Sequence, residues 1–137
     1  MRRTTLSVAY YVDASALVKL VVEETETTAL ITWLDVEDRT AVSCDLTRTE
    51  LLRATRRAAP DQLVRARQVL DGLTLTEVTA AVFEAAGRLD PTILRSLDAI
   101  HLAAALDLGD DLDGIVTYDA RLADAAHAQG VAVIAPS

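Results

Sequence analysis

Short apolar runs alternate with amphipathic stretches along the whole chain. The first run, residues 7–12, is rich in β-branched and aromatic residues and is typical of a buried strand. It is followed by apolar side chains at helical spacing, at Ala16, Leu17, Leu20 and Val21. Asp13 separates the two patterns and therefore lies where the predicted strand ends and the predicted helix begins.

Four later segments predict further short strands, at residues 40–43, 73–76, 115–118 and 131–134. Helical patterns fill the intervals, at residues 26–36, 45–57, 60–72, 78–89, 96–108 and 120–129. Strands that alternate with helices form parallel sheets that are covered on both faces. We therefore expect a three-layer α/β/α fold with a small parallel sheet of about five strands, as one domain over residues 1–137.

The composition indicates what the core is built from and in which compartment the protein is expected. The chain is 51% hydrophobic but only 4% aromatic, which indicates a core built from Ala, Val and Leu. The single cysteine, Cys44, excludes an internal disulfide and fits the reducing cytoplasm. Arg2 and Arg3 before an apolar run faintly resemble the start of a signal peptide, but the run is short and Asp13 interrupts it. No stretch approaches the roughly 20 apolar residues of a membrane span, so we expect a cytoplasmic protein.

The net charge of −8 argues against a protein that holds nucleic acid by its overall electrostatic field. The basic residues are nevertheless concentrated in one middle stretch, at Arg48, Arg53, Arg56, Arg57, Arg65 and Arg67. A local group of arginines, together with a bound metal ion, could offset the acidic background. In that case we expect only modest affinity for nucleic acid.

Four acidic residues occupy positions where chemistry is expected in an α/β fold. Asp119 follows a predicted strand and precedes a helix, as Asp13 does, and ligands of such folds bind past the carboxyl ends of the strands. Asp98 lies in the first turn of an apolar helix, and Glu50 lies within the predicted helix at 45–57. Each also has an ordinary interpretation, as a helix-capping or dipole-favoured aspartate or as a solvated glutamate.

Taken together, the four carboxylates could converge at one edge of the sheet. They would then repel one another and raise their pKa values unless a cation were present. Hard oxygen ligands favour Mg²⁺ or Mn²⁺ over zinc. An ion held there could polarise a phosphate and lower the pKa of a bound water, which is the chemistry of phosphodiester hydrolysis.

Three stretches of the chain resemble the motifs of PIN-domain ribonucleases. Residues 11–20 (YVDASALVKL) resemble the opening motif, and residues 94–105 (LRSLDAIHLAAA) match the central motif. Residues 117–122 (TYDARL), with Gly130 and Val131 after them, match the last motif. The resemblance extends over almost the whole chain and makes the expected fold PIN-like. The length and the motifs look most like the VapC toxins of bacterial toxin–antitoxin pairs.

This resemblance implies a Mg²⁺-dependent endoribonuclease toxin that hydrolyses RNA phosphodiester bonds, with Mn²⁺ as an alternative ion. It also implies neutralisation by a cognate VapB-type antitoxin and a homodimer. The residues that match the catalytic and metal-binding acids of the family are Asp13, Glu50, Asp98 and Asp119. Ser15 and Thr117 match positions that orient carboxylates or a metal-bound water. The motif around Glu50 is weak, and the alternatives for its place are Glu23, Glu24 and Glu26.

Several residues near these motifs have more than one interpretation. His101 shares a helical face with Asp98 and could bind a metal, but a packed neutral histidine is preferred because Mg²⁺ sites are built from oxygen. Arg53 and Arg57 follow Glu50 at helical spacing. They could contact RNA phosphates, receive an acidic antitoxin segment or form a solvated face. The aromatic residues that could stack on bases are expected in the core instead, namely Tyr10, Tyr11 and Trp33.

Other classes of protein fit the sequence less well. A phosphoacceptor signalling domain needs a lysine after a late strand, whereas the only lysine is Lys19, in the first helix. A phosphatase with a nucleophilic aspartate would have a second aspartate two residues after Asp13, where Ser15 stands. Cys44 as a nucleophile would need a histidine base, and neither histidine is near it in sequence. The alternative function is a non-catalytic RNA- or protein-binding module on the same fold.

Overall fold

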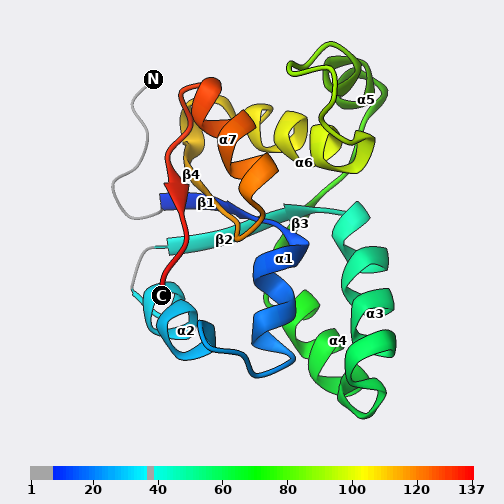
Figure 1. Ribbon diagram of the computed structural model, residues 1–137, viewed down its shortest axis with the longest axis vertical. Helices are drawn as coiled ribbons and strands as arrows, with labels where there is room; N and C mark the ends of the chain where they lie inside the picture. The colour runs from blue at the N-terminus through cyan, green and yellow to red at the C-terminus, as the bar shows by residue number, and fades with distance from the viewer. Residues whose placement is uncertain (1–7, 37–38) are drawn as a thin grey trace.

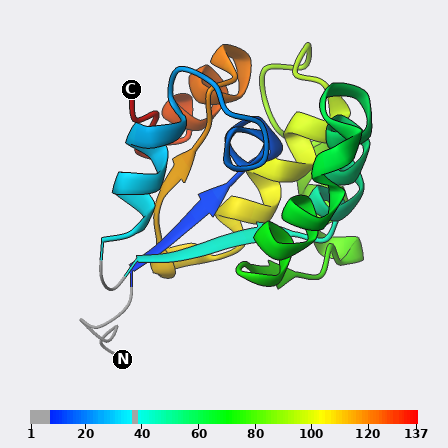
Figure 2. The ribbon, with the colours of Figure 1, turned by 90° about the horizontal axis from the view of Figure 1, so that it is seen from below.

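A five-stranded parallel sheet lies between two layers of helices in the computed structural model, which describes residues 8–36 and 39–137 (Figure 1). The strands are β1 (Val8–Val12), β2 (Arg39–Cys44), β3 (Thr74–Thr76), β4 (Leu112–Val116) and β5 (Val133–Ile134). Their order is β3-β2-β1-β4-β5, and all four pairings are parallel. In Figure 2, β1 (blue) runs between β2 (cyan) and β4 (orange). The predicted three-layer α/β/α fold is confirmed.

The two helical layers are divided in chain order. The helices of one layer are α1 (Ala14–Leu17), α2 (Thr27–Leu34), α3 (Leu46–Ala58) and α4 (Leu63–Asp71). Those of the other layer are α5 (Ala80–Gly87), α6 (Ser96–Leu106) and α7 (Ala120–Ala128). Short 3-10 turns follow α1 and precede α4 and β4, namely η1 (Val18–Leu20), η2 (Pro60–Gln62) and η3 (Gly109–Asp111).

Alternation along the central strands explains why the core has two parts. Neighbouring residues of a strand point to opposite faces of the sheet. Tyr11 and Ile115 accordingly pack with α5, α6 and α7, whereas Val12 and Val116 pack with the helices of the first layer. All four side chains are fully buried. An apolar run without a polar face, such as residues 8–12, is therefore what a central strand of this sheet requires.

Some predicted boundaries differ from the structure. β4 begins at Leu112 rather than at Ile115, because pairing with β1 draws the weakly apolar segment 112–114 into the sheet. Gly114 lies there in contact with Tyr10 and Ile134, and a Cβ atom would collide with the Ile134 side chain. β5 is limited to two residues, since Gly130 has a φ of 77° and the chain pairs with β4 only from Val133 onward. The signal-like segment at Arg2 and Arg3 lies outside the described residues.

The parallel sheet brings several strand ends to one edge. Val12 is the register partner of Val116, so the residues that follow β1 and β4 emerge side by side. Asp13 follows β1 and Thr117 follows β4, and α1 and α7 begin at this edge. Among the described residues, no helix is long and apolar enough to cross a bilayer.

Candidate active site

Asp13 is the buried acid at this edge, with only 4% of its surface exposed. It is the N-cap of α1: its Oδ1 accepts hydrogen bonds from the Ala16 amide at 3.1 Å and the Ser15 hydroxyl at 2.7 Å. Its Oδ2 accepts from the Thr117 hydroxyl at 2.7 Å. Burial raises the pKa of Asp13, and the three hydrogen bonds oppose that rise. Asp13 thus caps a helix, but its second oxygen is also held by a residue of a distant segment.

The hydroxyls of Ser15 and Thr117 connect Asp13 to the segment after β4. Their two oxygens lie 3.3 Å apart. The amide of Tyr118 donates to Ser15 Oγ at 3.0 Å, and the amide of Asp119 donates to Thr117 Oγ1 at 3.1 Å. Both hydroxyls therefore orient the Asp13 carboxylate and at the same time fix the backbone that carries Asp119.

Two of the predicted acids, Asp119 and Asp98, lie at the starts of α7 and α6. Asp119 is the N-cap of α7, and its Oδ1 accepts from the amides of Arg121 and Leu122 at 2.9 and 3.0 Å. Asp98 lies in the first turn of α6 but does not cap it, because the N-cap is Arg95 and no side chain provides a capping hydrogen bond. The Arg95 guanidinium is 4.0 Å from the Asp98 carboxylate.

The pKa of Asp98 shows which charges surround it. Partial burial raises this pKa most, and the carboxylates of Asp119 and Glu50 raise it further. The positive charges of Arg95 and His101 lower it. Asp98 is therefore within electrostatic reach of acids from α3 and α7, which places three carboxylates in one neighbourhood.

Glu50 enters this neighbourhood from the second turn of α3, where it is hydrogen-bonded through Oε1 to Nε2 of His101. The histidine is 2% exposed, and its Nδ1 lies 2.7 Å from the Tyr11 hydroxyl. Burial opposes a charge on the ring, but the contacts with Cys44 and Glu50 outweigh it and raise the pKa of His101 to about 10. The ring is packed as predicted, and the structure adds a carboxylate partner that the sequence did not indicate.

Cys44 lies beside a histidine, which its sequence neighbours did not indicate. Its Sγ lies 4.0 Å from Nδ1 of His101, a histidine 57 positions away. Burial would raise the pKa of the thiol, but the adjacent His101 and Tyr11 outweigh this effect and lower it. The thiol is nevertheless fully buried. It therefore cannot reach a polymeric substrate as a nucleophile.

The three glutamates considered as alternatives to Glu50 have other surroundings. Glu26 and Glu24 lie 2.9 and 3.6 Å from the ammonium group of Lys19, which also sits over the Tyr118 ring. Glu23 is exposed. Glu50 is thus the glutamate that the structure brings next to Asp98.

The chemistry of these side chains fits a hard divalent cation, because all four acids offer carboxylate oxygen. Among residues 8–36 and 39–137, however, no group of three or more His, Cys, Asp or Glu side chains is arranged so that it could hold a metal ion. Asp13 and Asp119 follow the ends of β1 and β4, whereas Asp98 and Glu50 come from α6 and α3, and the four carboxylates do not form such a group. The expectation that they form one metal site stays a prediction.

The arginines singled out in the sequence are exposed, and the three aromatic residues are buried to different degrees. Arg53, Arg56 and Arg57 are exposed and line a shallow hollow on α3. Tyr11 is in the core as predicted. Tyr10 and Trp33 are only half-buried and pack edge to face with ring centroids 4.6 Å apart.

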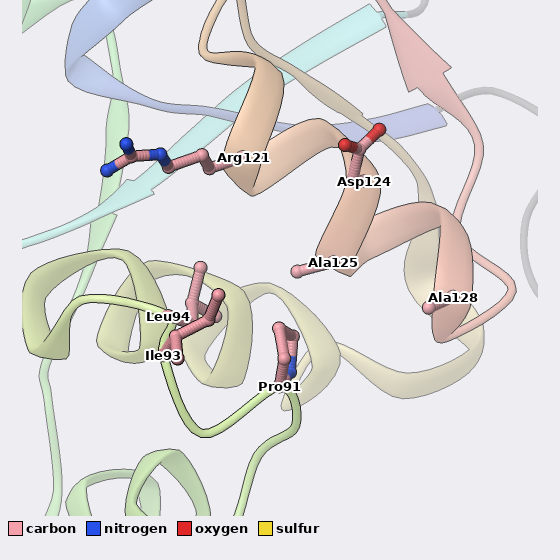
Figure 3. A pocket seen from close by; sticks show the side chains of 7 residues that line it. All are labelled: Pro91, Ile93, Leu94, Arg121, Asp124, Ala125 and Ala128. Carbon is pink, nitrogen blue, oxygen red and sulfur yellow. The ribbon is translucent and has the colours of Figure 1, made fainter.

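A hollow lies between α7 and the segment that leads into α6 (Figure 3). Its volume is about 580 Å³, and its walls are mostly apolar. Pro91, Ile93 and Leu94 face Ala125 and Ala128 across it. Ile93 is 88% exposed, which is unusual for so apolar a side chain. This groove contains none of the four predicted site acids.

Comparison with known proteins identifies the family of this chain and several of its relatives. The PIN domain family matches residues 10–128. Ribonuclease VapC46 of Mycobacterium tuberculosis is 46% identical over 129 residues, which cover 94% of this chain and 98% of that protein. The chain therefore belongs to the PIN domain family and, within it, to the VapC ribonucleases.

Two solved structures share the fold. The toxin VapC20 of Mycobacterium tuberculosis, described as cleaving the sarcin–ricin loop, has a TM-score of 0.74 at 18% identity. The match covers 93% of this chain and 99% of that one. A toxin–antitoxin complex from Klebsiella pneumoniae has a TM-score of 0.67 at 22% identity, over 96% of this chain and 98% of that one.

Proposed function

We propose that this chain is a metal-dependent endoribonuclease toxin that hydrolyses RNA phosphodiester bonds, with Asp13, Glu50, Asp98 and Asp119 as its catalytic and metal-binding acids. The observation that carries the proposal is the buried carboxylate of Asp13, which the hydroxyls of Ser15 and Thr117 hold at the ends of β1 and β4. The carboxylates of Asp119 and Glu50 also raise the pKa of Asp98, which supports it. Like charges are brought together at a cost. Such an arrangement at the carboxyl edge of a parallel sheet favours a site for a cation over independent solvated acids. Membership of the VapC ribonucleases supports the same reaction.

The proposed ion is Mg²⁺, with Mn²⁺ as an alternative, since both prefer oxygen ligands. When bound, such an ion polarises the phosphate and lowers the pKa of a coordinated water. The chain itself contributes the orientation of its ligands. Ser15 and Thr117 hold both oxygens of Asp13, while Nε2 of His101 is hydrogen-bonded to Glu50. Without a cation the acids repel one another, so we expect them to come closer together only when the ion binds.

RNA is proposed to run along α3, where Arg53 and Arg57 extend the face that carries Glu50. At about 1.5 Å per residue, these positions lie roughly 4.5 and 10.5 Å beyond Glu50 along the helix axis. Neither guanidinium has an ion pair with an acid that the structure describes. Contacts to phosphates would fix the position of the strand without reading its sequence. An acidic antitoxin segment is the competing occupant of the same arginines.

A partner protein is proposed because apolar side chains are exposed next to the acids. Ile93 is 88% and Leu97 48% exposed, and Leu97 immediately precedes Asp98. Exposed apolar surface beside a functional site is typical of an interface. We propose a VapB-type antitoxin as the inhibitor and a homodimer as the assembly of the toxin, acting in the cytoplasm where the RNA is found.

Cleavage by the purified chain tests the catalytic proposal. Total RNA is incubated with the protein in Mg²⁺, in Mn²⁺ and in EDTA, and cleavage sites are mapped by sequencing of the new ends. We expect defined cleavage with either ion and none in EDTA. Binding of RNA without cleavage under all three conditions would instead support the non-catalytic module.

Expression in a host without the antitoxin tests the toxin proposal. We expect growth arrest with loss of specific RNAs, and recovery when a small protein encoded beside the toxin is co-expressed. Normal growth at confirmed expression of the folded protein would count against it. The Asp98→Asn variant is the matched control, because it should be tolerated by the host.

A further inference from the structure

His101 is buried, yet both nitrogens of its ring have partners on other elements. Nδ1 lies 2.7 Å from the Tyr11 hydroxyl of β1, and Nε2 is hydrogen-bonded to Glu50 of α3. The ring also packs edge to face against Tyr11, with centroids 5.8 Å apart. Through these contacts α6 is joined to β1 and to α3 at one point.

The direction of the bond to Glu50 follows from the chemistry of the two groups. An ionised carboxylate only accepts, so Nε2 must carry the hydrogen. The Tyr11 hydroxyl is compatible with this in both protonation states of the ring, because it can donate to Nδ1 of a neutral imidazole or accept from an imidazolium. Glu50 therefore selects the proton on Nε2, and Tyr11 holds the ring in the orientation that points this proton at Glu50.

Only one oxygen of Glu50 is used by this contact. Oε1 is bonded to His101, whereas Oε2 has no hydrogen bond to any residue that the structure describes. The side chain is 24% exposed, so it is open to solvent in part. Its charge contributes to the raised pKa of Asp98. The histidine thus holds Glu50 by one oxygen, within electrostatic reach of Asp98, and leaves the other oxygen without a hydrogen bond to the described residues.

We propose that His101 is a positioning residue that acts through Glu50, with Tyr11 fixing the ring so that Nε2 donates to the carboxylate. The inference rests on the proposed function, because it takes Glu50 as one of the metal-binding acids. Residues that hold a ligand from behind typically change metal affinity or activity by about 10–100-fold when they are replaced. His101 itself is not a ligand, since its Nε2 is occupied by Glu50 and its Nδ1 faces the core.

A double-mutant cycle separates this role from simple core packing. Binding of Mn²⁺ to the RNA-free protein is measured by titration calorimetry for His101→Leu, Glu50→Gln and the double variant. We expect each single variant to weaken Mn²⁺ binding by about 10–100-fold, and the double variant to be no weaker than Glu50→Gln alone. If the two losses instead multiply, His101 acts independently of Glu50 and the inference is overturned.

Two conservative variants keep the test decisive if His101→Leu does not fold. His101→Gln retains an N–H donor close to the position of Nε2, and we expect it to recover most of the Mn²⁺ affinity. Tyr11→Phe keeps the aromatic ring but removes the hydroxyl, and we expect a loss that is smaller than that of Glu50→Gln. Thermal melts verify that each variant is folded. Full affinity in folded Tyr11→Phe together with no recovery in His101→Gln would overturn the inference.

A metal-free measurement is independent of activity. Long-range ¹H–¹⁵N spectra of the imidazole report which nitrogen carries hydrogen, and we expect a protonated Nε2 in the unaltered protein. A ring protonated on Nδ1 alone would overturn the inference. If Glu50→Gln binds Mn²⁺ normally, the assignment of Glu50 in the proposed function fails. If Glu50→Gln loses affinity while folded His101→Leu keeps it, only the role of His101 fails.

Discussion

Thr117 and Asp13 are 104 residues apart in the chain, and the hydroxyl of the first donates a 2.7 Å hydrogen bond to Oδ2 of the second. Thr117 is 1% and Asp13 4% exposed, so neither group can exchange this partner for bulk water. The same hydroxyl oxygen accepts from the Asp119 amide at 3.1 Å. One side chain therefore fixes the orientation of one site acid and the backbone of another.

Replacement of Thr117 by valine should show what this bond contributes. Valine has nearly the same shape but leaves the Asp13 carboxylate and the Asp119 amide without their partner. Leaving a buried polar group unsatisfied costs about 1–3 kcal/mol, so we expect the free energy of unfolding to fall by this amount. Thr117→Ser keeps the hydroxyl and is the matched control. Urea unfolding at neutral pH measures both, and a valine variant as stable as the parent would contradict the prediction.

Asp98→Asn should abolish RNA cleavage while leaving the fold intact. Asparagine keeps the size of the side chain but removes a charge that would hold the ion, so we expect cleavage at saturating Mg²⁺ to fall by orders of magnitude. Because Asp119 and Glu50 raise the pKa of Asp98, loss of its charge should also raise the melting temperature in metal-free buffer. Near-normal cleavage by the folded variant would remove Asp98 from the mechanism.

Replacing Arg53 and Arg57 together with glutamine should weaken RNA binding more than catalysis. We expect KM to rise while kcat changes little, and the salt dependence of KM to become less steep because two phosphate contacts are lost. Arg67→Gln on α4 changes an exposed arginine outside this face and is the matched control. Equal effects of the double variant and the control would show that α3 has no special role. An unchanged KM with loss of antitoxin binding would assign the arginines to the antitoxin.

The stability of the fold should depend on pH through the protonation of His101. Its pKa is raised from 6.5 to about 10 in the folded protein, so the ring stabilises the fold fully below pH 6.5 and loses this contribution as the pH rises through about 10. We therefore expect the melting temperature in EDTA to fall between pH 6.5 and 10, and to fall less in His101→Leu. The lowered pKa of Cys44 has the opposite effect, because it adds stability as the pH rises toward 9, so Cys44→Ala is the control. A profile that His101→Leu leaves unchanged would contradict the prediction.

Much of the fold was predictable because it depends on local patterns. The apolar run that ends at Val12 is followed at once by a polar residue and a helical pattern, and this strand-to-helix boundary is a property of neighbouring residues. The same holds for the segment around Asp119. In a parallel sheet, strands that end in this way must place their following residues at one edge. The proximity of Asp13 to the β4 end was therefore implied before any coordinates were known.

Other features were decided only by the tertiary structure. The partnership of His101 with Glu50 joins residues 51 positions apart, and it exists because α6 and α3 both pack beside β2. The position of Cys44 near the same ring has the same origin. Helical spacing in the sequence shows which residues share a face, but it cannot show which face of another helix they meet. The alternation of strands and helices was thus determined by the sequence alone, whereas the pairing of His101 with Glu50, and of Glu24 and Glu26 with Lys19, was determined by packing.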